Sequence, residues 1–279
     1  MEQAWRLALE ATLAGWGVSP RGLPTREVGE PVSIALASAR HAVVSSPARR
    51  LNQAYAAAEF CWIMAGRDDV KTLRFFNEAI AAFADQDGGQ RFFGAYGPPL
   101  ISQLSHVEET LRRDHQSRQA VVTLWRPSPP PTLDVPCTIA LHFMARDGAL
   151  SLVTYMRSND VWLGLPYDSQ TFCHILAWVA ARLDFAVGGY HHVVGSLHLY
   201  ERDAAAAQAI LESPQAPGEL IDVEFDTTFL PACAWEWFEA MPRGVAPPEH
   251  ALRLGGWGPL LSTAWRFAER KLMRPIHVP

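Results

Sequence analysis

The sequence predicts an α/β (α+β) protein, and two patterns near its middle carry that prediction. Leu150, Leu152 and Thr154 share one side of a period-two run, which predicts a strand that ends near Arg157. The apolar-periodic run over residues 172–183 predicts a buried helix soon afterwards. Of the 279 residues, 49% are hydrophobic and 19% are charged, which is typical of a globular protein with an ample core.

Helical spacing recurs on both sides of this centre. Trp5, Leu9 and Leu13 are four residues apart, so residues 2–15 are predicted to form an amphipathic helix. The Ala-rich segment N-Q-A-Y-A-A-A-E-F-C-W-I-M-A-G predicts a largely buried helix that ends at Gly66. Further helices are predicted over residues 69–84, 101–114, 202–212 and 260–271. Strands are predicted within residues 32–45, 120–125 and 219–226.

Charge and cysteine content exclude several classes of protein. The formal net charge of −5 provides no global basic field, so we expect no nucleic-acid partner and expect any phosphate to be met by a local arginine cluster. The 4 cysteines lack metal-ligand spacing, and Cys61 and Cys173 fit small core positions. No metal is therefore expected. Without a signal-peptide pattern or a membrane-length apolar run, a cytoplasmic location is expected.

The stretch from Arg157 to Asp160 is the first candidate site. It presents Arg, Ser, Asn and Asp in succession at a strand end, before a loop punctuated by Gly164 and Pro166. Packing would explain the apolar residues 161–163 that follow. It does not explain Arg157 or Asp160, so these two residues point to function.

Three motifs in order and in register resemble the thymidylate synthase family. R-S-N-D-V-W-L-G-L-P-Y-D, from Arg157 to Asp168, is similar to the family's nucleotide-binding signature R-S-x-D-x-x-L-G-x-P-F-N. V-P-C, ending at Cys137, is similar to its Pro-Cys catalytic loop, and G-S-L-H-L-Y, ending at Tyr200, to its G-x-x-H-x-Y segment. The resemblance covers at least residues 118–200.

The resemblance implies one domain over residues 1–279, with a mixed β-sheet flanked by helices and a homodimer packed through the sheet. The Pro-rich segment 127–136 could pass for a linker, yet the motifs fall on both sides of it. Family members send two adjacent arginines to the neighbouring active site. Here Arg118 matches the first and Gln119 replaces the second.

The resemblance assigns catalytic roles to Cys137, Glu59, Asp168 and Tyr96. Pyrimidine C5 becomes nucleophilic when a thiolate adds at C6, and Cys137 would supply that thiolate. Arg157 or Arg21 beside the sulfur would keep it reactive. Each of these two residues also has a non-catalytic alternative. Cys137 could be a buried structural cysteine, and Glu59 could simply lie at the protein surface. In the family, the E-x-x-W glutamate directs protons and water around the pyrimidine.

The resemblance also implies two sets of binding residues. Phosphate and sugar would be held by Arg21, Arg118, Arg157, Ser158, His198 and Tyr200, with Asp168 at the base. The co-substrate 5,10-methylenetetrahydrofolate would meet Arg49, Arg50, Phe83, Asp160, Gly164 and Tyr167. Taken alone, Arg21 fits a solvated turn, His198 a core histidine and Asp160 a turn cap. Ile80 and Phe83 replace the family's folate-contacting tryptophans, and the tail 273–279 does not clearly match.

Asp168 distinguishes the expected substrate. The family places Asn there, whose amide complements N3–H and O4 of uracil, whereas a carboxyl group suits N3 and the N4 amino group of cytosine. The alternative is a helix N-cap. The change is typical of the cytidylate hydroxymethylase branch, which implies a (d)CMP 5-hydroxymethylase whose exocyclic methylene is captured by water. The Ala-rich composition favours CMP as the substrate and a nucleoside-antibiotic pathway.

Two other functions stay open at this point. The first is a thymidylate synthase that acts on dUMP, against which Asp168, Ile80 and Phe83 argue. The second is a nucleotide-binding regulator without catalysis, which folate-dependent release of tritium from C5 would exclude. Ribose and deoxyribose are not distinguished by the sequence.

Overall fold

One mixed seven-stranded sheet joins segments from residue 16 to residue 200 in the computed structural model, which describes residues 1–85 and 87–273. The strands are β1 (Trp16–Val18), β2 (Thr25–Glu27), β3 (Val32–Leu36), β4 (Val121–Thr123), β5 (Thr138–Arg146), β6 (Ala149–Asp160) and β7 (Ala186–Tyr200). Their order is β1-β2-β7-β6-β5-β4, and β3 also pairs with β7. The predicted α/β class is confirmed.

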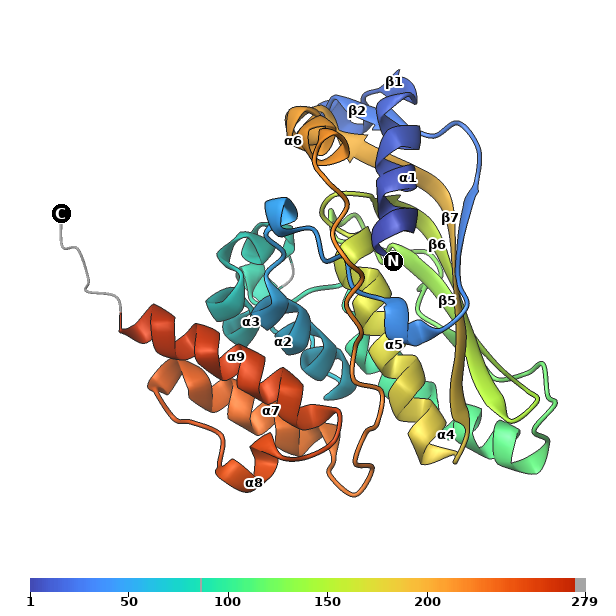
Figure 1. Cartoon of the computed structure of the whole chain (residues 1–279), viewed down its shortest axis with the longest axis vertical. Coiled ribbons are helices and arrows are strands. Elements are labelled where there is room, and N and C mark those ends of the chain that lie inside the picture. The colour runs from blue at the N-terminus through green and yellow to red at the C-terminus, as the bar shows by residue number, and fades with distance from the viewer. Residues whose placement is uncertain (86, 274–279) are drawn as a thin grey trace. The chain divides into compact units, whose positions relative to one another are not determined.

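The central strands β6 and β7 are parallel, whereas every other pairing in the described sheet is antiparallel. A parallel pair requires a crossover, and α5 (Leu165–Arg182) supplies it between the two strands. α5 packs on β6 and β7, and α1 (Glu2–Leu13) packs on β7, so both helices cover one face of the sheet (Figure 1). The ends of β6 and β7 therefore emerge together beside the start of α5.

The two faces of the sheet differ in burial. Paired residues Leu141, Thr154, His192 and Ile34 form a row across four strands, and all four are buried. On the other face, two rows are half-buried or exposed. They consist of Thr123, Ala140, Tyr155, Val193 and Ser33, and of Val121, His142, Val153, His191 and Ala35. None of these ten residues carries a carboxylate, an ammonium or a guanidinium group.

The described residues divide into two compact units. The first holds the sheet and comprises residues 1–51, 106–125 and 137–221; the second comprises residues 52–105, 126–136 and 222 onward. The prediction of a single domain over residues 1–279 stays a prediction. Of the tail 273–279, residues 274–279 lie outside the described residues.

The second unit is mainly helical. Its helices include α2 (Gln53–Met64), α3 (Lys71–Phe76), α7 (Pro231–Ala240), α8 (Glu249–Leu252) and α9 (Trp257–Leu272). α2 is buried on nearly all sides, and Phe60 stacks on Trp257 of α9 with ring centroids 5.8 Å apart. Phe76 and Phe238 join α3 to α7 at 5.7 Å. Because α2 packs against α9, α7 and α3 and has little solvent-facing surface, the Ala-rich helix carries few polar residues.

Most predicted helices are confirmed, some with different bounds. α1, α2, α6 (Glu201–Glu212) and α9 match their predictions, while α4 spans Gly97–Arg113 and α5 begins well before residue 172. The single helix predicted over 69–84 is wrong. Asn77 has extended backbone, ends α3 and caps a following 3-10 turn over Glu78–Phe83.

The strand predicted over residues 219–226 is also wrong. Ile221, Val223 and Phe225 are buried in alternation, as in a strand. The backbone N–H of Ile221 nevertheless bonds to the carbonyl of Arg40, and that of Asp226 to the carbonyl of Gly255. Because these two partners are isolated residues outside any strand and no ladder forms, the alternation reflects burial without sheet pairing.

Candidate active site

Cys137 and Arg157 lie side by side. Cys137 immediately precedes β5, and Arg157 is on the neighbouring strand β6. The N–H of Arg157 donates to the carbonyl of Cys137 at 2.9 Å, and its Nη2 donates to the Cys137 Sγ at 3.7 Å. The guanidinium group also lies 6.0 Å from the ring centre of Trp125. Cys137 is half-buried, so the arrangement presents a partly accessible thiol next to a fixed cation.

The polar ends of β6 and β7 bring the next residues together. Ser158 pairs with Ser196, and Asp160 pairs with His198. The Oγ of Ser158 lies 3.3 Å from Nδ1 of His198, and the rings of His198 and Tyr200 meet edge to face at 5.5 Å. Hydroxyl, imidazole and phenol groups are therefore clustered at one sheet end, within the same unit as Cys137.

The turn after β6 is held by Asp160. Its Oδ1 accepts from the N–H of Trp162 at 2.7 Å and of Leu163 at 2.9 Å. Its Oδ2 is buried and has no hydrogen-bond partner among the described residues. Burial raises the pKa of Asp160 above its usual range. The alternative role of Asp160 as a turn cap is therefore correct for Oδ1. Oδ2 can still accept a hydrogen bond.

Arg49 packs on this turn. Its Nη2 donates to the carbonyl of Trp162 at 2.7 Å, and its guanidinium group lies 4.5 Å from the centre of the Trp162 ring. The ring centres of Trp162 and Trp5 are in turn 6.1 Å apart. Arg49 thus stabilises the loop, and its predicted contact with a folate stays a prediction.

Asp168 is inside α5, not at its N-cap. The N-cap is Gly164, and no side-chain capping bond forms there, so the alternative role of Asp168 as an N-cap is wrong. The Oδ2 of Asp168 accepts from Nδ2 of Asn159 at 2.6 Å. The pKa of Asp168 is raised to about 7, chiefly by burial and also by the charge of Asp160, whereas the Asn159 bond opposes the shift. Asp168 is therefore a carboxyl group that changes charge near neutral pH.

This raised pKa predicts a pH-dependent stability. An unfolded Asp titrates near pH 3.9, so between about pH 4 and 7 the folded state keeps a proton that the unfolded state has released. The free energy of unfolding should fall as pH rises through this window. Asp168→Asn should remove that loss, on the order of 2 kcal/mol, and urea denaturation at about pH 5 and about pH 8 measures it.

Comparing the variant with wild type also removes an opposing pH-dependent contribution to the free energy of unfolding. Burial lowers the pKa of His192 to about 3, so His192 costs stability as pH falls below about 6.5. Both proteins contain His192, and only the difference between them reports Asp168. A difference that does not change with pH would contradict the prediction.

The remaining predicted residues occupy the following positions. Glu59 is half-buried on α2 and accepts from the Tyr55 hydroxyl at 2.6 Å. Arg21 has φ 55° in a 3-10 turn between β1 and β2, and β2 pairs with the end of β7. Tyr167 is in the first turn of α5. Arg50 and Phe83 are exposed, and Tyr96, which is half-buried, directly precedes α4.

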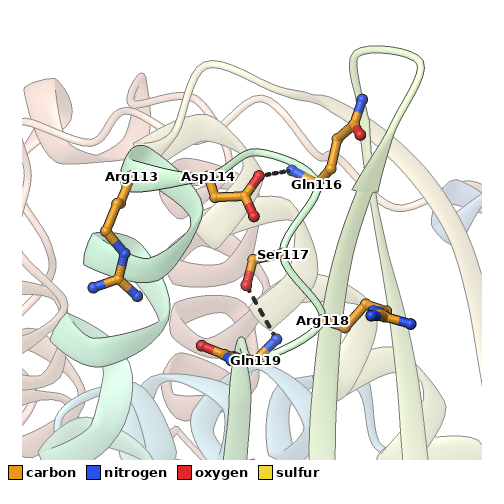
Figure 2. Close-up of a pocket in the computed structure, with 6 residues that line it drawn as sticks. All are labelled: Arg113, Asp114, Gln116, Ser117, Arg118 and Gln119. Carbon is orange, nitrogen blue, oxygen red and sulfur yellow. Dashed lines mark hydrogen bonds between the residues drawn. The ribbon is translucent and has the colours of Figure 1, made fainter.

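Arg118 is exposed just before β4 and lines a groove of about 600 Å³ with Arg113, Asp114, Gln116, Ser117 and Gln119. Figure 2 shows the bonds that shape this loop, from the N–H of Gln116 to Asp114 and from the N–H of Gln119 to Ser117. The guanidinium groups of Arg113 and Arg118 extend from opposite sides of the loop (Figure 2). The loop therefore presents Arg118 outward from its own chain.

Within residues 1–85 and 87–273, no three His, Cys, Asp or Glu side chains are grouped as metal ligands. In the same part of the chain, no helix combines the length and apolar character needed to cross a membrane.

The sequence prediction missed Asn159 and Tyr55. Asn159 occupies the variable position of the R-S-x-D motif, and only its bond to Asp168 singles it out. Tyr55 lies four residues before Glu59, the spacing at which helical side chains meet, so that contact could have been anticipated.

The chain is similar to known proteins over much of its length. A family model described as thymidylate synthase matches residues 31–228. A deoxyuridylate hydroxymethyltransferase of Bacillus phage SP01 is 32% identical over 209 residues, which cover 68% of this chain and 54% of the phage protein. The matched region thus spans about half the length of that relative.

Proposed function

Because the chain belongs to the thymidylate synthase family, we propose that it transfers a one-carbon unit to C5 of a pyrimidine nucleoside monophosphate. The observation that carries the proposal is the 3.7 Å contact between Arg157 and the Cys137 sulfur. A guanidinium group at this position stabilises a thiolate, which is the nucleophilic form of cysteine. The polar cluster of Ser158, His198 and Tyr200 is in the same unit.

Cys137 starts the reaction. Its sulfur forms a bond to C6 of the pyrimidine, and the electron pair of the C5–C6 double bond moves to make C5 nucleophilic. Methylenetetrahydrofolate supplies the one-carbon unit when it is bound. After C5 has bonded to the one-carbon unit, C5 loses its proton, and that electron pair would form the exocyclic C5=CH2 bond as the bond from this carbon to the folate nitrogen breaks. Water then adds to the methylene carbon, and the electron pair returned to C5 re-forms the C5–C6 double bond as the C6–S bond breaks, which leaves the pair on the sulfur.

The nucleotide is held by groups of complementary charge. Arg157 and Arg21 pair with the phosphate, Ser158 donates to it, and Arg118 approaches from a neighbouring subunit. His198 and Tyr200 bond to the sugar. The clustering of Ser158 with His198 at 3.3 Å supports this assignment.

The residues near Asp160 fit a folate. The buried Oδ2 of Asp160 needs a hydrogen-bond donor, and the amino and ring N–H groups of a pterin are such donors. Gly164 and Tyr167 follow on the same turn. We assign folate contacts to these three residues, with Phe83, Arg49 and Arg50 toward its distal part.

Cytidylate is the first candidate substrate. A carboxyl group with a pKa near 7 presents both a donor and an acceptor at neutral pH, which complements N3 and the N4 amino group of cytosine. The product would be 5-hydroxymethylcytidylate from CMP or dCMP, formed when water adds to the exocyclic methylene. Ile80 and Phe83, which replace the folate-stacking tryptophans, fit a reaction without hydride transfer from the folate.

Deoxyuridylate is the second candidate substrate. The phage relative is named a deoxyuridylate hydroxymethyltransferase, which supports the same terminal step on a different base. A thymidylate synthase reaction on dUMP is the third possibility, and it differs by ending in hydride transfer.

One assay separates these reactions. The purified protein is incubated with methylenetetrahydrofolate and each of CMP, dCMP, UMP and dUMP, and the products are identified by mass spectrometry. A gain of CH2O on a cytidine nucleotide supports the first candidate and identifies the sugar. A gain of CH2O on dUMP supports the second, and a gain of CH2 with dihydrofolate indicates thymidylate synthesis.

Glu59 is proposed to position the attacking water. We expect Glu59→Gln to lower the rate of hydroxymethylation roughly 10²- to 10⁴-fold, because an amide does not accept the proton of water. Nucleotide affinity, measured by calorimetry, should change little. Glu109→Gln, an exposed glutamate on α4, is the control. An unchanged rate in Glu59→Gln would remove Glu59 from this role.

A homodimer packed through the sheet completes the proposal. The two half-exposed rows, one with Tyr155 and Val193 and the other with Val153 and His191, form an uncharged part of the sheet face, which suits a surface that a second copy covers. The exposed Arg118 at β4 is then available to the partner's phosphate site.

A further inference from the structure

Asn159 and Asp168 form a hydrogen-bonded pair at the proposed base site. Asn159 is 3% exposed, and its Nδ2 donates to Asp168 Oδ2 at 2.6 Å. Its Oδ1 is buried and has no partner in the part of the chain that the structure describes. Asp168 keeps partial exposure. Asn159 is therefore shielded from any ligand, and of the two residues only Asp168 is accessible enough to contact a base.

Gly164 leaves room for this pair. A Cβ atom at residue 164 would lie 2.9 Å from Nδ2 of Asn159 and 3.1 Å from Oδ2 of Asp168. Both distances are too short for an ordinary contact. Since Gly164 does not have a positive φ, this close approach, rather than backbone conformation, accounts for the glycine.

A neutral carboxyl group alone distinguishes cytosine from uracil poorly. Cytosine presents an acceptor at N3 and a donor at N4, whereas uracil presents a donor at N3 and an acceptor at O4. A carboxyl group has one donor and one acceptor oxygen, and moving its proton from one oxygen to the other reverses the pattern. The pKa of Asp168, about 7, makes the neutral form abundant at neutral pH. Asp160 on β6 and the buried phenol of Tyr190 on β7 are the ionisable groups that interact with its charge.

The Asn159 bond removes this symmetry. A carbonyl oxygen accepts hydrogen bonds better than a hydroxyl oxygen, so the oxygen that Nδ2 contacts favours the unprotonated state. We propose that Asn159 is a specificity-determining positioning residue: by donating to Oδ2, it keeps the Asp168 proton on Oδ1 and makes the carboxyl group select one base. The inference rests on the proposed function, because it assumes that Asp168 faces the base.

The test compares base selectivity, defined as the ratio of kcat/KM for cytidine and uridine nucleotides. Asn159→Leu keeps the size of the side chain and removes the donor. We expect the selectivity of Asn159→Leu to be roughly tenfold or more lower than that of the wild type, because one buried hydrogen bond no longer distinguishes the two oxygens. Thr171→Val, a buried polar position on α5 without a side-chain partner among the described residues, is the matched control and should leave the ratio unchanged.

A double-variant cycle separates this role from a structural one. In the Asp168→Ala background no carboxyl group remains whose proton Asn159 could position, so Asn159→Leu should no longer change the ratio. A loss of stability alone would act equally in both backgrounds. If Asn159→Leu does not fold, Asn159→Ser provides the same test, because its shorter side chain does not reach Asp168.

The outcomes separate the inference from the proposed function. The base that the wild type prefers decides between cytidylate and uridylate. Loss of selectivity in Asn159→Leu that disappears in the Asp168→Ala background supports the inference whichever base is preferred. An unchanged ratio, or an equal change in both backgrounds, overturns it.

Discussion

Cys137→Ala is expected to abolish exchange of the C5 hydrogen of the nucleotide with solvent, with a loss on the order of 10⁴-fold or more. The physical reason is that C5 carries no nucleophilic electron pair until sulfur has added at C6. Release of tritium from C5-labelled nucleotide measures this step directly. Nucleotide binding should persist, because Arg157 and Ser158 are unchanged.

Cys233→Ala is the matched control. Cys233 on α7 is half-buried like Cys137, so it controls for the loss of a partly accessible thiol. We expect it to keep full exchange activity. Exchange that survives in Cys137→Ala would exclude Cys137 as the nucleophile and would remove the central residue of the proposed function.

Asp168→Asn is expected to shift preference from cytidine toward uridine nucleotides. An amide presents its donor and acceptor permanently, and it cannot supply the hydrogen-bond pattern of a carboxyl group by moving a proton. Sites that match a base by hydrogen bonds reject the wrong analogue by roughly 10⁴-fold at best, so a change of several orders in the kcat/KM ratio is the upper limit. Steady-state kinetics with all four nucleotides measures it.

Asp147→Asn is a suitable control for this experiment. Asp147 is exposed in the turn between β5 and β6 and has φ 49°, a conformation that Asn also tolerates. It changes the same functional group far from any proposed contact with the base. A preference that is unchanged in Asp168→Asn would leave Asp168 with a structural role only.

Local patterns in the sequence predicted much of the site. The R-S-N-D-V-W-L-G-L-P-Y-D motif placed Arg157 at a strand end and Asp168 close to a helix, because alternation, glycine and proline act over a few residues. Helices α1, α2, α6 and α9 were predicted for the same reason. The strand predicted over residues 219–226 is wrong because alternate residues there are buried without strand pairing. Alternating burial does not show whether a neighbouring strand supplies backbone hydrogen bonds.

Local sequence patterns show which functional groups the chain carries and near which strands and helices they gather. Which of these groups meet depends on the tertiary fold. Pairing of β5 with β6 brings Arg157 to Cys137, 20 residues away, and the turn into α5 brings Asn159 to Asp168. The register of β6 with β7 places Ser158 near His198. Such contacts depend on strand register and chain reversal, which are selected by the packing of the whole sheet, and a local pattern does not encode them.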